Sequence, residues 1–270
     1  MISLISRIRP TRRIVLIFVL SVLFIFVTRQ SSDNKPEQTL EKAKGMLSLN
    51  TDKVQYSFGE QVNIQITSLN NEGSILCNSS LELSIIKEGR AIEQPGVTHS
   101  STCDPDNTAT LNPDYTAYFA PLEEGEYQIK VTNLDSNDSS ELQITVGDNQ
   151  LDYSISRWGA HRVNPQSANR YPMKLILTAN KDFTGKLVDQ IPLFLEVVWY
   201  GPAKVEESES GQTVTWEIDI KEGETKEFTY EYKIPNDTSD NFPLGPSKLV
   251  SKEETYFEEI RPWNITINHN

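Results

Sequence analysis

The sequence predicts an all-β protein, with two tandem antiparallel β-sandwiches after one N-terminal transmembrane helix. Three observations lead to this prediction. Apolar and polar residues alternate in many short runs, turn-forming Gly, Asn, Asp and Pro clusters separate those runs, and one uncharged apolar stretch lies near the N-terminus. A period of two places one side of each run on a core and the other in water, which is typical of half-buried strands.

The apolar stretch reads IVLIFVLSVLFIFV from Ile14 to Val27, with arginines on both flanks. As a helix it spans about 22 Å, against about 30 Å for a bilayer core, so it is close in length to a cleavable signal sequence. No small-residue cleavage site follows it, and flanking arginines extend the span by snorkelling. We therefore expect an uncleaved signal anchor over residues 14–28. Cleavage, followed by secretion, is the alternative.

Charge is distributed unevenly along the chain. Four arginines are the only charged residues before residue 29, so the remainder carries a formal −17 where the whole chain has −13. The positive-inside rule makes residues 1–13 a cytoplasmic basic tail and places the rest outside the membrane. Residues 29–45, polar and of mixed charge, are expected to form a stalk. The acidic remainder repels phosphates, which excludes nucleic acid as a partner.

The first sandwich is expected over residues 46–147. Alternating runs predict strands at residues 62–66, 81–85, 115–119, 127–131 and 142–146. About seven short strands in about 100 residues are typical of a sandwich.

The second sandwich is expected over residues 151–270, after a Gly147-Asp148-Asn149-Gln150 junction. Its strands are predicted at residues 173–177, 193–200, 214–218, 228–232 and 263–267.

The two cysteines are Cys77 and Cys103. In an oxidising compartment they are expected to form one disulfide within the first sandwich. Closing a loop of this length stabilises the fold by about 3 kcal/mol in the chain-entropy model. Two buried free thiols are the alternative.

Two segments resemble known surface domains. Residues 56–66 (YSFGEQVNIQI) and 115–132 (YTAYFAPLEEGEYQIKVT) are similar to bacterial immunoglobulin-like (Ig-like) and macroglobulin-type domains, although Phe58 stands where proline is usual. The second half, with its Trp216 strand and Arg261-x-Trp263, is similar to C-terminal sandwich domains of microbial surface proteins. The resemblance implies two tandem Ig-like sandwiches of an adhesin, stalk or receptor ectodomain, and brings no catalytic residue with it.

We therefore expect a non-enzymatic adhesion, spacer or scaffolding role at the cell surface. Nucleophile elbows, phosphate loops, zinc motifs and dinucleotide fingerprints do not occur in their required context. The alternative is a ligand-binding ectodomain for carbohydrate or calcium, or an accessory subunit of a membrane complex. No cofactor is expected, and calcium is the one ion kept as an alternative.

Calcium could be held by four acidic residues in turns, which are Asp104, Asp106, Asp148 and Asp152. Calcium takes six to eight oxygen ligands, which acidic turns can supply. Their spacing matches no defined calcium loop, and Asp also forms ordinary turns by capping its own backbone.

Carbohydrate could stack on aromatic rings of the second sandwich, for which Trp158 and Tyr200 are the candidates. Trp199 and Trp216 alternate with apolar neighbours, so both are expected to face the core. Arg157 beside Trp158 predicts a structural cation–π pair.

Overall fold

The computed structural model describes residues 46–70, 73–147, 151–167, 169–209 and 211–268. The basic tail, the anchor over residues 14–28 and the stalk lie outside these residues. Among the described residues, no helix has the length and apolar character needed to cross a membrane.

The described secondary structure consists of strands, and almost every pairing is antiparallel, which confirms the all-β prediction. In the first sandwich (β1–β9), one sheet has the order β1-β3-β7-β6, spanning Leu47–Thr51, Val62–Ser68, Tyr115–Phe119 and Thr98–His99. The other has the order β2-β9-β8-β4-β5, spanning Gln55–Ser57, Ser139–Gly147, Gly125–Asn133, Leu81–Lys87 and Arg90–Glu93.

The second sandwich (β10–β21) is built from two large sheets and one small one. The sheet β10-β12-β17-β14 spans Tyr153–Gly159, Tyr171–Ala179, Thr225–Lys233 and Glu196–Trp199. The sheet β15-β16-β13-β19-β20 spans Lys204–Ser208, Gly211–Ile220, Phe183–Ile191, Ser247–Ser251 and Glu254–Glu258. Three short strands, β11-β21-β18, span Arg162–Val163, Trp263–Ile267 and Phe242–Leu244.

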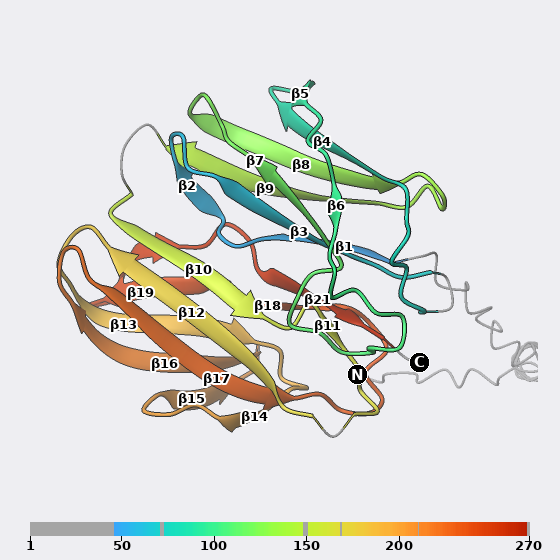
Figure 1. The fold of residues 1–270 in the computed structure, drawn as a ribbon. Coiled ribbons are helices and arrows are strands. Elements are labelled where there is room, and N and C mark those ends of the chain that lie inside the picture. Colours follow the sequence, from blue (N-terminus) through green and yellow to red (C-terminus); the bar gives the residue numbers. More distant parts are fainter. Residues whose placement is uncertain (1–45, 71–72, 148–150, 168, 210, 269–270) are drawn as a thin grey trace, which may run out of the picture. The chain divides into compact units, whose positions relative to one another are not determined.

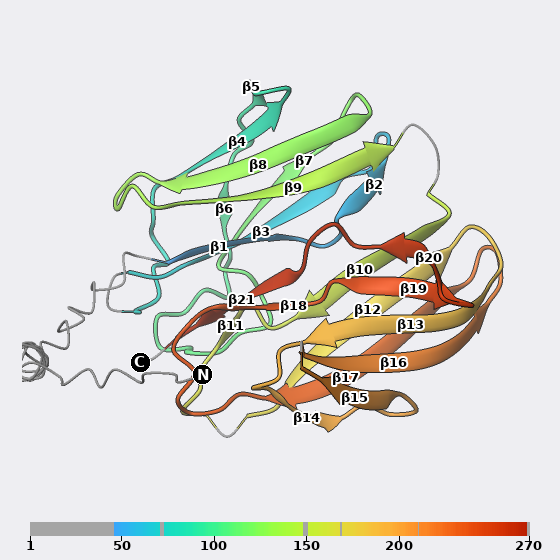
Figure 2. The same ribbon diagram turned by 180° about the vertical axis from the view of Figure 1, so that it is seen from behind.

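The two large sheets of the second sandwich lie face to face. Figure 1 shows β12 and β17 in front of β13 and β16, and Figure 2 shows the reverse order from behind. Tyr230 and Tyr232 from one sheet and Leu187 and Trp216 from the other belong to a single buried cluster.

Alternation explains each core. In β8, Tyr127, Ile129 and Val131 are buried, whereas Gln128 and Lys130 between them are only half-buried. β1–β9 enclose one apolar cluster and β10–β21 enclose another. Each sandwich therefore has its own core. The candidate binding residues are to be sought at the junction between the sandwiches and on their outer faces.

Candidate functional site

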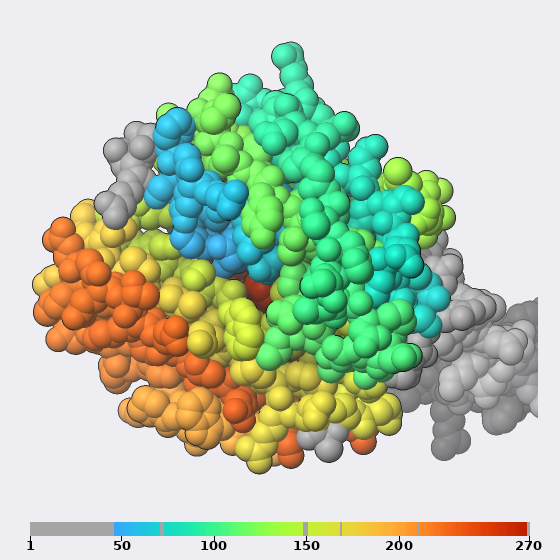
Figure 3. Space-filling view, in the orientation of Figure 1, coloured from blue at the N-terminus to red at the C-terminus, as the bar shows by residue number. Residues whose placement is uncertain are grey.

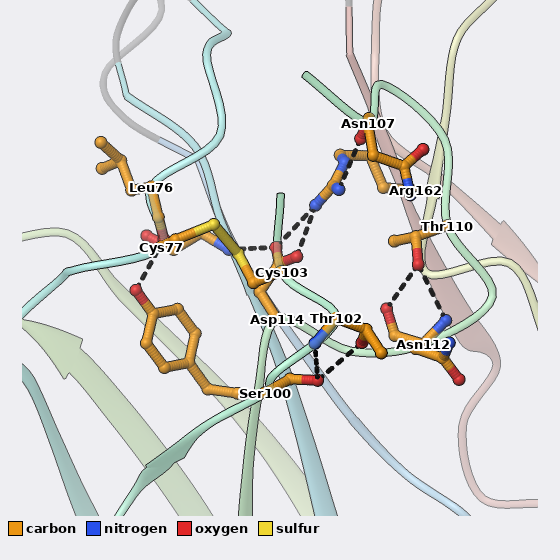
Figure 4. A network of polar contacts seen from close by, with 12 residues as sticks. Leu76, Cys77, Ser100, Thr102, Cys103, Asn107, Thr110, Asn112, Asp114 and Arg162 are labelled. Atoms are coloured by element: carbon orange, nitrogen blue, oxygen red, sulfur yellow. Dashed lines mark hydrogen bonds and ion pairs between the residues drawn. A yellow bond between two sulfur atoms is a disulfide. The ribbon is translucent and has the colours of Figure 1, made fainter. Parts of the chain in front are cut away.

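A long loop of the first sandwich, residues 100–114, reaches the second sandwich, and we call it the docking loop. Its two ends meet where the Ser100 amide donates to the Asp114 carbonyl at 2.8 Å. Near its start, Cys103 forms the expected disulfide with Cys77. Beside it, the Tyr115 hydroxyl donates to the Leu76 carbonyl at 2.6 Å (Figure 4). Both ends of the loop are thus fixed to the first sandwich.

The middle of the docking loop pairs with the second sandwich as a short piece of sheet. Thr110 and Arg162 form an isolated antiparallel bridge, in which the Thr110 amide donates to the Arg162 carbonyl at 2.9 Å. The His161 amide donates to the Thr110 carbonyl at 3.0 Å. Ala109 and Leu111 pack against the core of the second sandwich. The loop therefore contributes both backbone hydrogen bonds and apolar contacts.

The docking loop ends at a buried ion pair between its last residue, Asp114, and Arg162 of the second sandwich (Figure 4). The Arg162 Nη1 donates to both carboxylate oxygens at 2.7 Å, and its Nη2 donates to the Asn107 carbonyl at 2.8 Å. Both residues are only 1% exposed. Burial raises the pKa of Asp114, and Arg162 opposes that effect. Such a pair is strongly coupled, because removal of either partner leaves the other charge buried alone.

More polar contacts connect the two sandwiches along β1 and β21. The Asn50 amide group pairs with the Asn264 backbone as a neighbouring strand would, donating at 2.9 Å and accepting at 2.9 Å. The Arg261 guanidinium donates to Thr51 and to the carbonyls of Lys53 and Gln143. Burial lowers the pKa of Arg261 to about 10. These directional contacts fix one sandwich against the other.

A second charged cluster lies inside the second sandwich, around Arg157. Its guanidinium donates to Asp189 and Glu259, with closest distances of 2.5 and 2.6 Å, and to Ser247 at 2.7 Å. The Tyr230 hydroxyl donates to Asp189 at 2.9 Å. Burial raises the pKa of Tyr230 well above its usual value. These five residues are 5% exposed or less, so the cluster has no surface on which a substrate could react.

Among the described residues, the calcium candidates Asp104, Asp106 and Asp152 do not form a common group of potential metal ligands. Asp104 accepts from the Asp106 amide at 3.0 Å, which is an ordinary turn. The Asp152 carboxylate pairs with Lys181 at 2.8 Å, and Asp148 lies outside the described residues. Within the described ranges, the one group of potential metal ligands is Cys77, His99 and Cys103. Its two sulfur atoms are joined to each other and so offer no thiolate.

The candidate carbohydrate residues are both exposed. Trp158 has 41% and Tyr200 has 39% of its surface accessible. The cation over the Trp158 ring is Lys174, at 5.8 Å from its centroid, because Arg157 points to the opposite face of β10 and into the core. The expected pairing of Arg157 with Trp158 is therefore wrong.

The prediction for Trp199 is also wrong, and β14 supplies the reason. Trp216 is in the core at 3% exposure, but Trp199 is 48% exposed. The register shifts within β14, since Val197 pairs with Tyr232 whereas Trp199 pairs with Glu231. The extra residue, Val198, is a β-bulge that moves Trp199 to the solvent face. Alternation within β14 alone could not reveal this shift.

No protein-family model matches the chain, and no curated protein sequence matches it. Solved structures that resemble it include trypsin-activated α-2-macroglobulin from Escherichia coli, at 13% identity and a TM-score of 0.32, covering 83% of this chain and 16% of that one. Dimeric latent PorU from Porphyromonas gingivalis is 12% identical with a TM-score of 0.32, and the match covers 85% of this chain and 21% of PorU. The Yersinia pseudotuberculosis adhesin InvE is 11% identical with a TM-score of 0.29, and the match covers 82% of this chain and 58% of InvE. The chain thus spans less than two thirds of each.

Proposed function

We propose that this chain is a non-enzymatic adhesion or spacer protein of the cell surface, whose two sandwiches act as one rigid arm. The observation that carries the proposal is the buried junction between them. An arm that holds a binding surface away from a membrane must resist bending, and domains joined by a bare linker move relative to each other by default. Here the Asp114–Arg162 pair and the docking loop oppose such motion.

The proposed location follows from the sequence. The apolar segment over residues 14–28 would anchor the chain, with the arginine-rich tail inside and both sandwiches outside. A disulfide and an acidic surface are suited to an oxidising exterior.

The absence of enzymatic activity is part of the proposal. The group of titratable side chains around Arg157 is enclosed in the second sandwich. Its hydrogen bonds connect β10, β13, β17 and β19, so each carboxylate is used to hold strands together rather than to meet a substrate.

Attachment of whole cells tests the role. Cells lacking the chain should detach from their natural surface at lower shear than the parent. The full-length chain should restore attachment, and Arg162→Met, which weakens the junction, should restore it only in part. Equal attachment of the parent and the deletion strain would sink the adhesive role.

A further inference from the structure

Two tryptophans of the second sandwich are exposed, although burial of an indole is strongly favourable. Trp216 and Trp263 are 3% and 1% exposed, whereas Trp158 and Trp199 are 41% and 48% exposed. Large aromatic rings dominate the energetics of cores and interfaces when they are covered. Two half-exposed indoles within one domain therefore need an explanation.

The β-bulge in β14 determines on which face of the sheet Trp199 lies. Without the register shift, Val198 would pair with Glu231 and Trp199 would lie opposite Tyr230, which is fully buried. With the shift, Trp199 lies opposite Glu231 on the outer face. The Trp199 ring lies near Gly201, since a Cβ atom added to Gly201 would be 3.6 Å from two atoms of that ring. Bulges commonly re-aim side chains beside functional sites.

Both exposed indoles lie on the same face of the β10-β12-β17-β14 sheet. Trp158 pairs with Lys174, and Lys174 pairs with Thr229. One row further along, Pro172 pairs with Glu231 and Glu231 with Trp199. Paired residues of antiparallel strands share a face, and strand spacings put the two tryptophans about 16 Å apart. Figure 3, in the view of Figure 1, shows this face toward the reader.

The face that carries the two tryptophans is polar and electrically balanced. Lys174 pairs with Glu227 at 3.0 Å, and Arg170 approaches Glu231 to 3.8 Å. Glu196 lies opposite Lys233 in the register. Three acidic and three basic side chains therefore leave no net charge here, on a chain whose formal charge is −13.

We propose that this face binds a neutral oligosaccharide, with Trp158 and Trp199 stacking against sugar rings. The inference rests on the proposed adhesive function and names its ligand class. A pyranose offers a C–H face to an indole and hydroxyl groups that both donate and accept. The carboxylate, ammonium and guanidinium groups around the two rings supply both donors and acceptors. A phosphate-bearing ligand would require excess positive charge, and a docked protein strand would require an apolar stripe instead of Lys174, Thr229 and Glu231.

Binding of defined sugars tests the proposal. The full-length chain, held in a detergent without a sugar headgroup, is applied to an array of immobilised neutral and anionic glycans. The best ligand is then titrated in solution by calorimetry. We expect a neutral oligosaccharide to bind with an affinity that salt leaves unchanged. Trp158→Ala and Trp199→Ala should each weaken binding at least about tenfold, which is about 1.4 kcal/mol.

Tyr118→Ala is the matched control, because Tyr118 is a 52% exposed aromatic residue on the first sandwich. It should bind as the parent does. Both tryptophan variants alter exposed side chains and should keep the parent's circular dichroism and melting temperature.

Two results would overturn the assignment. One is the absence of binding to every neutral glycan. The other is a concentration-dependent dimer in sedimentation that Trp199→Ala abolishes, since the face would then meet a second copy. If cells still need the chain for attachment, only the glycan assignment falls. If sugar binds but attachment does not change, the adhesive role falls and the site stands.

Discussion

Arg162→Met should expose the energetic importance of the junction between the sandwiches. The change removes the guanidinium and keeps most of the aliphatic stem. Asp114 then remains buried at 1% exposure without its cation. The Asn107 carbonyl also loses its donor.

The structure sets the magnitude of this effect. Removing one partner of a buried ion pair costs about 3–5 kcal/mol, because the remaining charge stays desolvated. We therefore expect a loss of about 4 kcal/mol in the free energy of unfolding. For a protein of this size that corresponds to a fall of about 8–16 °C in melting temperature.

A double-mutant cycle gives the decisive assay. Urea unfolding, followed by tryptophan fluorescence, is measured for the parent, Arg162→Met, Asp114→Leu and the double variant. The double variant leaves no unpaired charge. Its loss in the free energy of unfolding should therefore be smaller, by about 3 kcal/mol, than the sum of the losses of the two single variants. Arg170→Met serves as the control, since its pair with Glu231 is exposed and should contribute under about 1 kcal/mol. A loss below about 1 kcal/mol for Arg162→Met, or additive single losses, would refute the reasoning.

Three further predictions concern the same unit. Cys103→Ser should lower the free energy of unfolding by about 3 kcal/mol, because the unfolded chain without the disulfide gains conformational entropy. Hydrogen exchange should become faster first in residues 100–114. Uniform acceleration across the chain would contradict a local role for the disulfide. Burial beside Arg162 lowers the pKa of His161 to about 3, so its neutral form contributes stability above pH 6.5 that is lost as the pH falls toward 3. His161→Phe should therefore lose less stability across that range, by up to about 1.4 kcal/mol per pH unit, and parallel stability curves would refute the assignment. Arg157→Met should destabilise the second sandwich by about 3–5 kcal/mol in thermal unfolding, since two carboxylates lose their cation, and an unchanged melting temperature would disprove that role.

The alternating pattern of the sequence identifies strands in which every residue on the core-facing side is apolar. The runs at residues 62–66, 115–119 and 263–267 reappear as β3, β7 and β21, because each has apolar residues on the side that meets a core. Their positions depend only on neighbours within a few residues, so the local pattern is sufficient.

Two of the strands that escaped prediction, β10 and β13, carry charge toward the core. β10 and β13 each bury a charged residue, Arg157 and Asp189, where an apolar residue would have revealed the period. These residues are partners of each other across 32 positions of sequence. Asp114 and Arg162 are likewise 48 positions apart. No local pattern indicates a charge whose partner is distant, and a bulge such as that at Val198 depends on the neighbouring strand.

Labelling of intact cells shows whether both sandwiches are displayed outside an anchored membrane segment. A membrane-impermeant amine reagent is applied to cells that make the protein, and modified lysines are identified by mass spectrometry. Lys130 in the first sandwich and Lys186 in the second should both be modified, and the modified chain should be recovered in the membrane fraction. Modification of these lysines only after lysis, or recovery of the chain in the medium alone, would contradict this arrangement.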